Sequence, residues 1–168
     1  MTAAGKGTAR ARAAVHGTVV AWPPGGGVLI LGPSGAGKSD LALRLIDRGA
    51  RLVGDDYIHL FASGPGLYAS APAPLAGLLE VRGLGLVRQR YLPQARIALV
   101  VHLAARETVE RMPRMRYKFL RGVRLPVMSV DPWDQTAAPK VEQAYRRFGA
   151  TRRLGLAVPS PTPTRTRS

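Results

Sequence analysis

One short segment carries residues that could bind the phosphates of a nucleotide. Residues 32–39 match the pattern G-x-x-x-x-G-K-S. Glycines in such a loop let the chain curl so that successive backbone N–H groups point at phosphate oxygens. The lysine supplies positive charge to the β- and γ-phosphates, and the serine hydroxyl is a ligand that Mg²⁺ accepts. The predicted cofactor-binding residues are therefore Gly32, Pro33, Ser34, Gly35, Ala36, Gly37, Lys38 and Ser39.

The segments on either side have the character that a phosphate-binding P-loop requires. Residues 28–31 are an apolar run typical of a buried strand, and residues 39–48 have apolar side chains at helical spacing before Gly49. This order of strand, loop and helix favours a P-loop over the alternative, a glycine-rich turn before an ordinary helix. Residues 15–22 are also β-rich, so we expect a hairpin that leads into the loop.

A pair of adjacent carboxylates follows the next predicted strand. Residues 51–54 form a short β-rich run that ends at Asp55 and Asp56. Since a single helix connects the strands at 28–31 and 51–54, we expect them to be parallel with a right-handed crossover. Parallel strands bring their carboxyl ends to one edge of a sheet, so both aspartates should lie beside the phosphates. The alternative is a turn capped by these side chains.

Other acidic and histidine residues give weaker signals. No apolar run is recognised that ends in a lone aspartate, and residues 98–101, for example, lead to His102. We therefore expect the aspartate pair to hold the metal, together with Glu80. Glu80 lies in an apolar segment where a buried carboxylate would need a partner, although a surface pair with Arg82 explains it as well. His16, at the start of a strand, is by itself more typical of a structural histidine.

The composition indicates one domain with a basic surface. The chain has 168 residues, with 25 Lys and Arg against 10 Asp and Glu, and a net charge of +15. This excess, partly in residues 111–124, favours an acidic partner or nucleic acid, and a solvated basic surface explains it equally well. The sequence has no cysteine, which excludes disulfides and thiolate zinc sites, and no bilayer-spanning apolar stretch, so we expect a cytoplasmic protein.

The order of four segments resembles the HPr kinase/phosphorylase family, bacterial enzymes that phosphorylate and dephosphorylate a serine of the phosphocarrier protein HPr. The segments are His16-Gly17, residues 32–43, residues 48–56 (RGARLVGDD) and residues 78–87 (LLEVRGLGLV). P-loops are widespread, whereas this order is typical of the catalytic domain of that family. The chain is similar to the short alphaproteobacterial form, which has no separate N-terminal domain.

The resemblance implies ATP and Mg²⁺ as cofactors and HPr as the protein substrate. Lys38 and the loop amides would hold the phosphates, while Ser39 and Glu80 would bind the metal ion. The family likeness also implies a homo-oligomer, commonly a hexamer. Binding to a membrane or to nucleic acid is not expected.

The resemblance also implies how the phosphoryl group would be transferred. Asp55 would act as general base toward the acceptor serine and as general acid in the reverse direction, with Asp56 and His16 assisting its charge state. The arginine loop of the family is not recognisable in this chain, so either Arg121 or Arg124 is offered as its arginine.

The predicted organisation has one folded centre between two tails. We expect a disordered basic tail over residues 1–13, a P-loop kinase catalytic domain over 14–150, and a disordered Pro/Arg/Thr-rich tail over 151–168. The domain is expected to be of the α/β class, with a mixed central sheet and flanking helices. Two other functions stay open, a small-molecule P-loop kinase and a nucleotide-sensing regulatory or nucleic-acid-binding protein.

Overall fold

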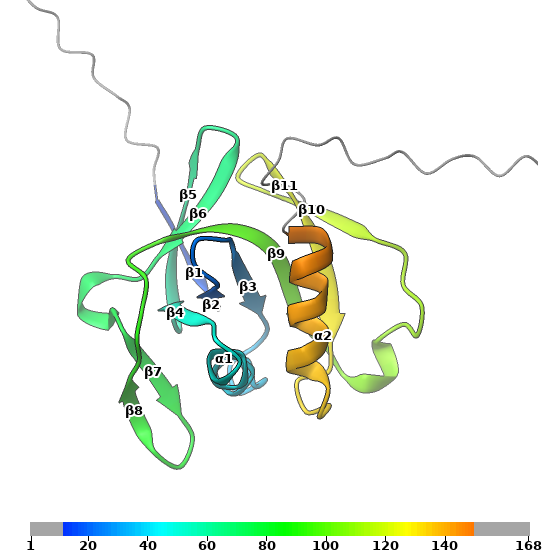
Figure 1. Ribbon diagram of the computed structural model, residues 1–168, viewed down its shortest axis with the longest axis horizontal. Coiled ribbons are helices and arrows are strands. Elements are labelled where there is room, and N and C mark those ends of the chain that lie inside the picture. The colour runs from blue at the N-terminus through cyan, green and yellow to red at the C-terminus, as the bar shows by residue number, and fades with distance from the viewer. Residues whose placement is uncertain (1–11, 150–168) are drawn as a thin grey trace, which may run out of the picture.

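Most of the apolar runs form strands of one mixed sheet. The computed structural model describes residues 12–149, shown in colour in Figure 1. The spatial order of the strands is β1 (Ala13–His16), β5 (Tyr57–Ser63), β6 (Gly66–Ser70), β9 (Ala95–Leu103), β3 (Gly27–Leu31), β2 (Thr18–Ala21) and β4 (Arg51–Gly54). Ala13, assigned to the first tail, already belongs to β1, and the rest of the two predicted tails lies almost entirely outside the described residues.

Two hairpins complete the β structure. β10 (Arg116–Leu120) pairs with β11 (Val123–Val130), and β11 extends the sheet by pairing in parallel with β9. The second hairpin, β7 (Leu78–Val81) with β8 (Gly85–Arg88), forms a sheet of its own that projects from the body (Figure 1). β9 is the most shared strand, because β3 pairs along one side of it while β6 and β11 pair with the two ends of its other side.

The helix predicted over residues 39–48 is present, and a second helix lies near the end of the described chain. α1 (Lys38–Asp47) follows the glycine-rich loop, and α2 (Ala137–Ala144) continues into a π-helical turn at Tyr145–Gly149. Short 3₁₀ turns occur at Ala73–Leu75 and Arg106–Thr108. None of the helices within residues 12–149 has the length and apolar character needed to cross a membrane.

The sheet is buried on both faces. Alternate residues of β3 point in opposite directions, so Ile30 packs in the core that contains Leu41 of α1, together with residues of α2. Leu29 packs on the opposite face with Ile58 and Leu67, because β5 and β6 curl across that side (Figure 1). Packing against one face of this sheet fixes the direction of α1 relative to the central strands.

The topology places the ends of four strands together. β3 and β4 are parallel, as predicted, but they are not neighbours, because β2 lies between them and is antiparallel to both. β9 and β11 also run parallel to β3. The carboxyl ends of β3, β4, β9 and β11 therefore meet at one end of the sheet, called here the loop end, where β2 has its amino end.

Candidate functional site

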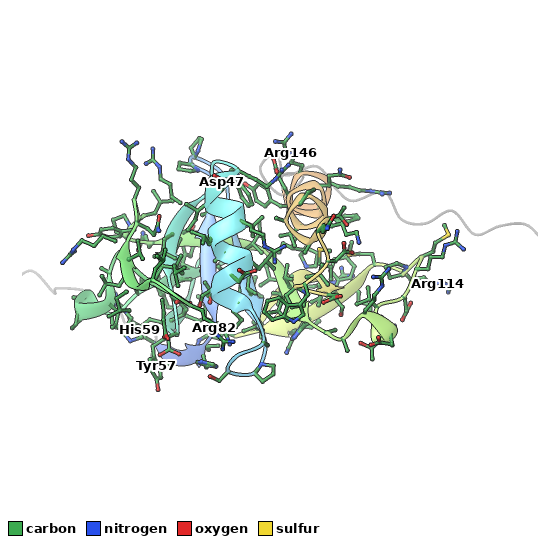
Figure 2. The ribbon with its side chains drawn as sticks, turned by 90° about the horizontal axis from the view of Figure 1, so that it is seen from below. Asp47, Tyr57, His59, Arg82, Arg114 and Arg146 are labelled. Atoms are coloured by element: carbon green, nitrogen blue, oxygen red, sulfur yellow. The ribbon has the colours of Figure 1, made fainter. Side chains whose placement is uncertain are left out.

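A pocket of about 310 Å³ lies at the loop end of the sheet. Its lining comes from the glycine loop (residues 32–39), the turn after β4, the β7 hairpin and the turn after β11. Figure 2 shows that Arg82 and Tyr57 lie at this end of α1, whereas Asp47 lies at its other end. The predicted site residues that line the pocket are His16, Ser34, Gly35, Gly37, Lys38, Ser39, Asp55, Asp56 and Glu80.

The backbone of the glycine loop adopts the conformation that its glycines predict. Gly35 and Gly37 have φ angles of 77° and 100°, in the left-handed region that favours glycine. Gly37 is also the N-cap of α1, and no side chain within residues 12–149 caps the helix there. The first amide groups of α1 are thus available to an anion, which the positive end of the helix dipole also favours.

Lys38 is folded across the loop. Its ammonium group donates hydrogen bonds to the carbonyl oxygens of Gly32 and Pro33, each with a donor–acceptor distance of 2.9 Å. Burial lowers the pKa of Lys38, and the nearby carboxylates of Asp55 and Asp56 partly oppose that shift. Of the other predicted contacts, Gly32, Pro33 and Ala36 do not line the pocket.

Asp55 is buried and held by three elements. Its carboxylate accepts a hydrogen bond of 2.7 Å from the Thr18 hydroxyl in β2, and the Ser39 hydroxyl in α1 lies 3.0 Å from both of its oxygens. The backbone N–H of Glu80 in β7 donates a further bond of 3.3 Å to Oδ2. Because these donors come from different elements, the carboxylate has a fixed position beside the first turn of α1.

Asp56 lines the pocket too, but its side chain is exposed where that of Asp55 is buried. Its φ angle of 68° lies in the left-handed region, and its carboxylate lies 2.8 Å from Nε2 of His16, with both side chains about half exposed. The Asp56 carbonyl accepts a bond from the N–H of Gly17, which joins this turn to β2. The two aspartate side chains therefore bond to other elements, and the alternative of a turn capped by these side chains is wrong.

Glu80 lines the pocket as predicted but is exposed, not buried. The ion pairs among the described residues do not include one between Glu80 and Arg82, so the surface-pair alternative is wrong too. Arg82 also lines the pocket, where it is the arginine found among the described lining residues.

The two arginines offered for the arginine loop lie elsewhere. Arg121 is in the turn between β10 and β11, and Arg124 is near the start of β11 with its guanidinium 3.7 Å from the centre of the Tyr117 ring. β11 runs parallel to β3, so its first residues lie at the end of the sheet opposite the loop end. Neither arginine lines the pocket, so the role offered for them stays a prediction that the pocket of the described chain does not support.

Sequence reasoning missed two features of the turn after β11, and one of them, Trp133, contributes to the pocket. β11 is a largely apolar run that ends in the lone aspartate Asp131, so the statement that no run does so is wrong. Trp133 follows and lines the pocket. The signal was present in the sequence, but Pro126 and Ser129 interrupt the apolar run.

The fold and the pocket define an α/β domain with a candidate phosphate site at the amino end of a helix. The chain belongs to the HPr Serine kinase C-terminal domain family, whose model matches residues 8–131. This confirms the resemblance found in the sequence.

Individual relatives agree with this assignment. The chain is 40% identical over 135 residues to an HPr kinase/phosphorylase of Leptothrix cholodnii, covering 71% of this chain and 41% of the relative. It is 46% identical over 98 residues to one of Bordetella pertussis, covering 52% and 32%. The solved Hpr(Ser) kinase/phosphatase from Coxiella burnetii is similar with a TM-score of 0.71 and 26% identity, covering 80% of this chain and 95% of that one. The chain thus spans less than half the length of these curated relatives.

Proposed function

We propose that the protein is an ATP-dependent protein-serine kinase that acts on HPr and also catalyses phosphorolysis of the phosphoserine. The observation that carries this proposal is the buried Asp55 carboxylate, held by three elements in the same pocket as Lys38 and the glycine loop. The names of its relatives support the same activity and substrate.

The glycine loop and Lys38 would bind the phosphates of ATP. Lys38 now donates to two loop carbonyls, and turning its ammonium toward the pocket would give the β- and γ-phosphates a positive charge. Arg82, which lines the same pocket, would supply a second positive charge to the phosphates. The amides at the start of α1 would complete the cradle.

The residues present fit a magnesium ion that is bound together with a nucleotide. Ser39 and Glu80 offer a hydroxyl and a carboxylate in one pocket, which are oxygen ligands of the kind that Mg²⁺ prefers. Residues 12–149 contain no group of three or more His, Cys, Asp or Glu able to hold a metal, so phosphate oxygens would have to complete the set. Such an ion would offset negative charge on the β- and γ-phosphates.

Asp55 would move the proton in both directions of the reaction. As the serine oxygen forms its bond to the γ-phosphorus and the bond to ADP breaks, the Asp55 carboxylate accepts the hydroxyl proton. In phosphorolysis, inorganic phosphate attacks the phosphoserine, pyrophosphate forms, and protonated Asp55 returns a proton to the departing serine oxygen. His16 and Asp56, whose side chains lie 2.8 Å apart, line the same pocket as this carboxylate and would assist its charge state.

Phosphotransfer from labelled ATP to purified HPr tests the proposal. Asp55→Asn should lower transfer at least about 100-fold, because a positioned base contributes that much or more, while ATP still binds. Asp47→Asn is the matched control, since Asp47 lies at the opposite end of α1 and should leave transfer unchanged (Figure 2). Wild-type transfer rates in Asp55→Asn would contradict the role of Asp55.

The other expectations have their own tests. Turnover of a metabolite without labelling of HPr would favour a small-molecule kinase instead. A cytoplasmic location and a homo-oligomer stay predictions, the second of which sedimentation would check.

A further inference from the structure

Trp133 is a large aromatic side chain that lies exposed beside the glycine loop. Its exposed fraction is 65%, yet it lines the pocket. A Cβ at Gly37 would lie only 3.4 Å from Cη2 of the Trp133 indole, so one edge of the ring sits against the N-cap of α1. Core packing does not explain this position, because most of the ring faces solvent.

The turn that carries Trp133 is tied to α1. The N–H of Trp133 donates a 3.0 Å bond to the Asp131 carboxylate, and the N–H of Asp134 donates to the Asp131 carbonyl. From α1, the Arg44 guanidinium donates to the carbonyls of both Pro132 and Asp134. The indole therefore has a defined position relative to the helix that presents the phosphate site.

The sheet order puts Trp133 and Asp55 on opposite sides of the strand that leads into the glycine loop. Asp55 follows β4, which is separated from β3 by β2, while Trp133 follows β11, which is separated from β3 by β9. In phosphoryl transfer the attacking and leaving oxygens lie roughly in line, on opposite sides of the phosphorus. With the acceptor serine on the side of Asp55, the ADP leaving group, which carries the nucleoside, would lie on the side of Trp133.

We propose that Trp133 forms the base subsite of this pocket, with its exposed indole stacked on the nucleobase of the bound nucleoside triphosphate. The inference deepens the proposed function and rests on it. Trp133 is suited to this because the other ring in the pocket lining, His16, is engaged by Asp56 on the acceptor side. Aromatic side chains stack on bases through their π-faces, without needing hydrogen bonds.

A single-tryptophan protein tests the contact directly. The chain has two tryptophans, and Trp22 stacks on Tyr145 with ring centroids 4.8 Å apart, outside the pocket lining. In Trp22→Phe protein, ATP should quench or shift the fluorescence of Trp133, whereas inorganic tripolyphosphate, which has no base, should have much less effect.

Calorimetry then measures what the indole contributes. Trp133→Ala should weaken ATP binding about tenfold, equal to about 1.4 kcal/mol, and leave tripolyphosphate binding unchanged. Trp133→Phe should restore most of the loss. Phe119→Ala is the matched control, because Phe119 is an exposed aromatic residue of β10 outside the pocket and its loss should not change ATP affinity.

The outcomes separate this inference from the proposed function. Equal ATP affinity of Trp133→Ala and wild type, or an equal loss of ATP and tripolyphosphate binding, would overturn the base subsite while the kinase proposal stands. A wild-type protein that binds no ATP would instead overturn the proposed function, and the subsite with it.

Discussion

Replacing Thr18 by valine tests the hydrogen bond that anchors Asp55 to β2. Thr18 is fully buried, and its hydroxyl donates a hydrogen bond of 2.7 Å to Asp55 Oδ1. Valine keeps the β-branched shape that suits a strand but has no donor. The Asp55 carboxylate would then keep only the longer bonds from the Ser39 hydroxyl and the Glu80 N–H, of 3.0 and 3.3 Å.

The expected loss follows from the burial of the acceptor. A hydrogen bond to a charged group contributes about 1.5–3 kcal/mol to stability. Asp55 is only 7% exposed, so water cannot easily replace the missing donor. We expect Thr18→Val to lower the free energy of unfolding by about 2 kcal/mol, which for a chain of this size lowers Tm by about 4–8 °C.

Urea denaturation measures this loss against a matched control. The Thr108 hydroxyl also donates a 2.7 Å bond, but it is exposed and its acceptor is the neutral Ala105 carbonyl, so Thr108→Val should cost less than about 1 kcal/mol. In an Asp55→Asn background the cost of Thr18→Val should fall, since a double-mutant cycle isolates the interaction between the two side chains. Equal costs for Thr18→Val and Thr108→Val would refute the reasoning.

Three further changes have expected outcomes. Burial alone would raise the pKa of Glu142, but the hydrogen bonds and charges of Arg48 and Arg146 together outweigh it and hold this pKa below its usual value. The stabilisation is therefore present above about pH 4.5 and lost as the pH falls further. Glu142→Gln should therefore cost about 1–2 kcal/mol at pH 7 and much less near pH 3 in urea titrations, whereas a pH-independent cost would contradict this. Gly54→Ala should lower stability by about 1–3 kcal/mol in thermal unfolding, because its Cβ would lie 2.9 Å from that of Ala71. The Ser70 hydroxyl is buried with no partner among residues 12–149, so Ser70→Ala should leave the urea midpoint unchanged or raise it.

The position of Asp55 could be predicted because it depends on strand direction alone. Residues 28–31 and 51–54 are parallel and end at the same end of the sheet. The prediction did not need the two strands to be neighbours, and in fact β2 separates them. Since β2 is antiparallel to both, it leaves their relative direction unchanged.

Contacts between distant segments could not be predicted in the same way. The bond from Thr18 to Asp55 requires the register of β2 against β4, which no local pattern specifies. Glu80 has apolar neighbours in the sequence, yet it lies in a projecting hairpin where Leu84 and Leu86 are exposed as well. Side chains alternate along β7, so Leu79 is fully buried in the core while Glu80 lies on the opposite face of the strand.

The position of Trp133 in the pocket could not be predicted, for a different reason. The apolar run before Asp131 contains a proline, which is typical of edge strands, and a serine, so it gave a weak strand signal. Only the parallel pairing of β11 with β9 brings this turn to the loop end of the sheet.

The pairing of β9 with three strands has a consequence for folding of the chain during its synthesis. One side of β9 receives β11 only after residues 123–130 have left the ribosome, although β9 itself ends at Leu103. Until then its N–H and C=O groups along residues 100–103 form an unpaired edge, a template on which another chain can add a strand. Fragments truncated before β11 keep this edge of β9 unpaired, so we expect them to aggregate. Nascent chains pass through the same state during synthesis.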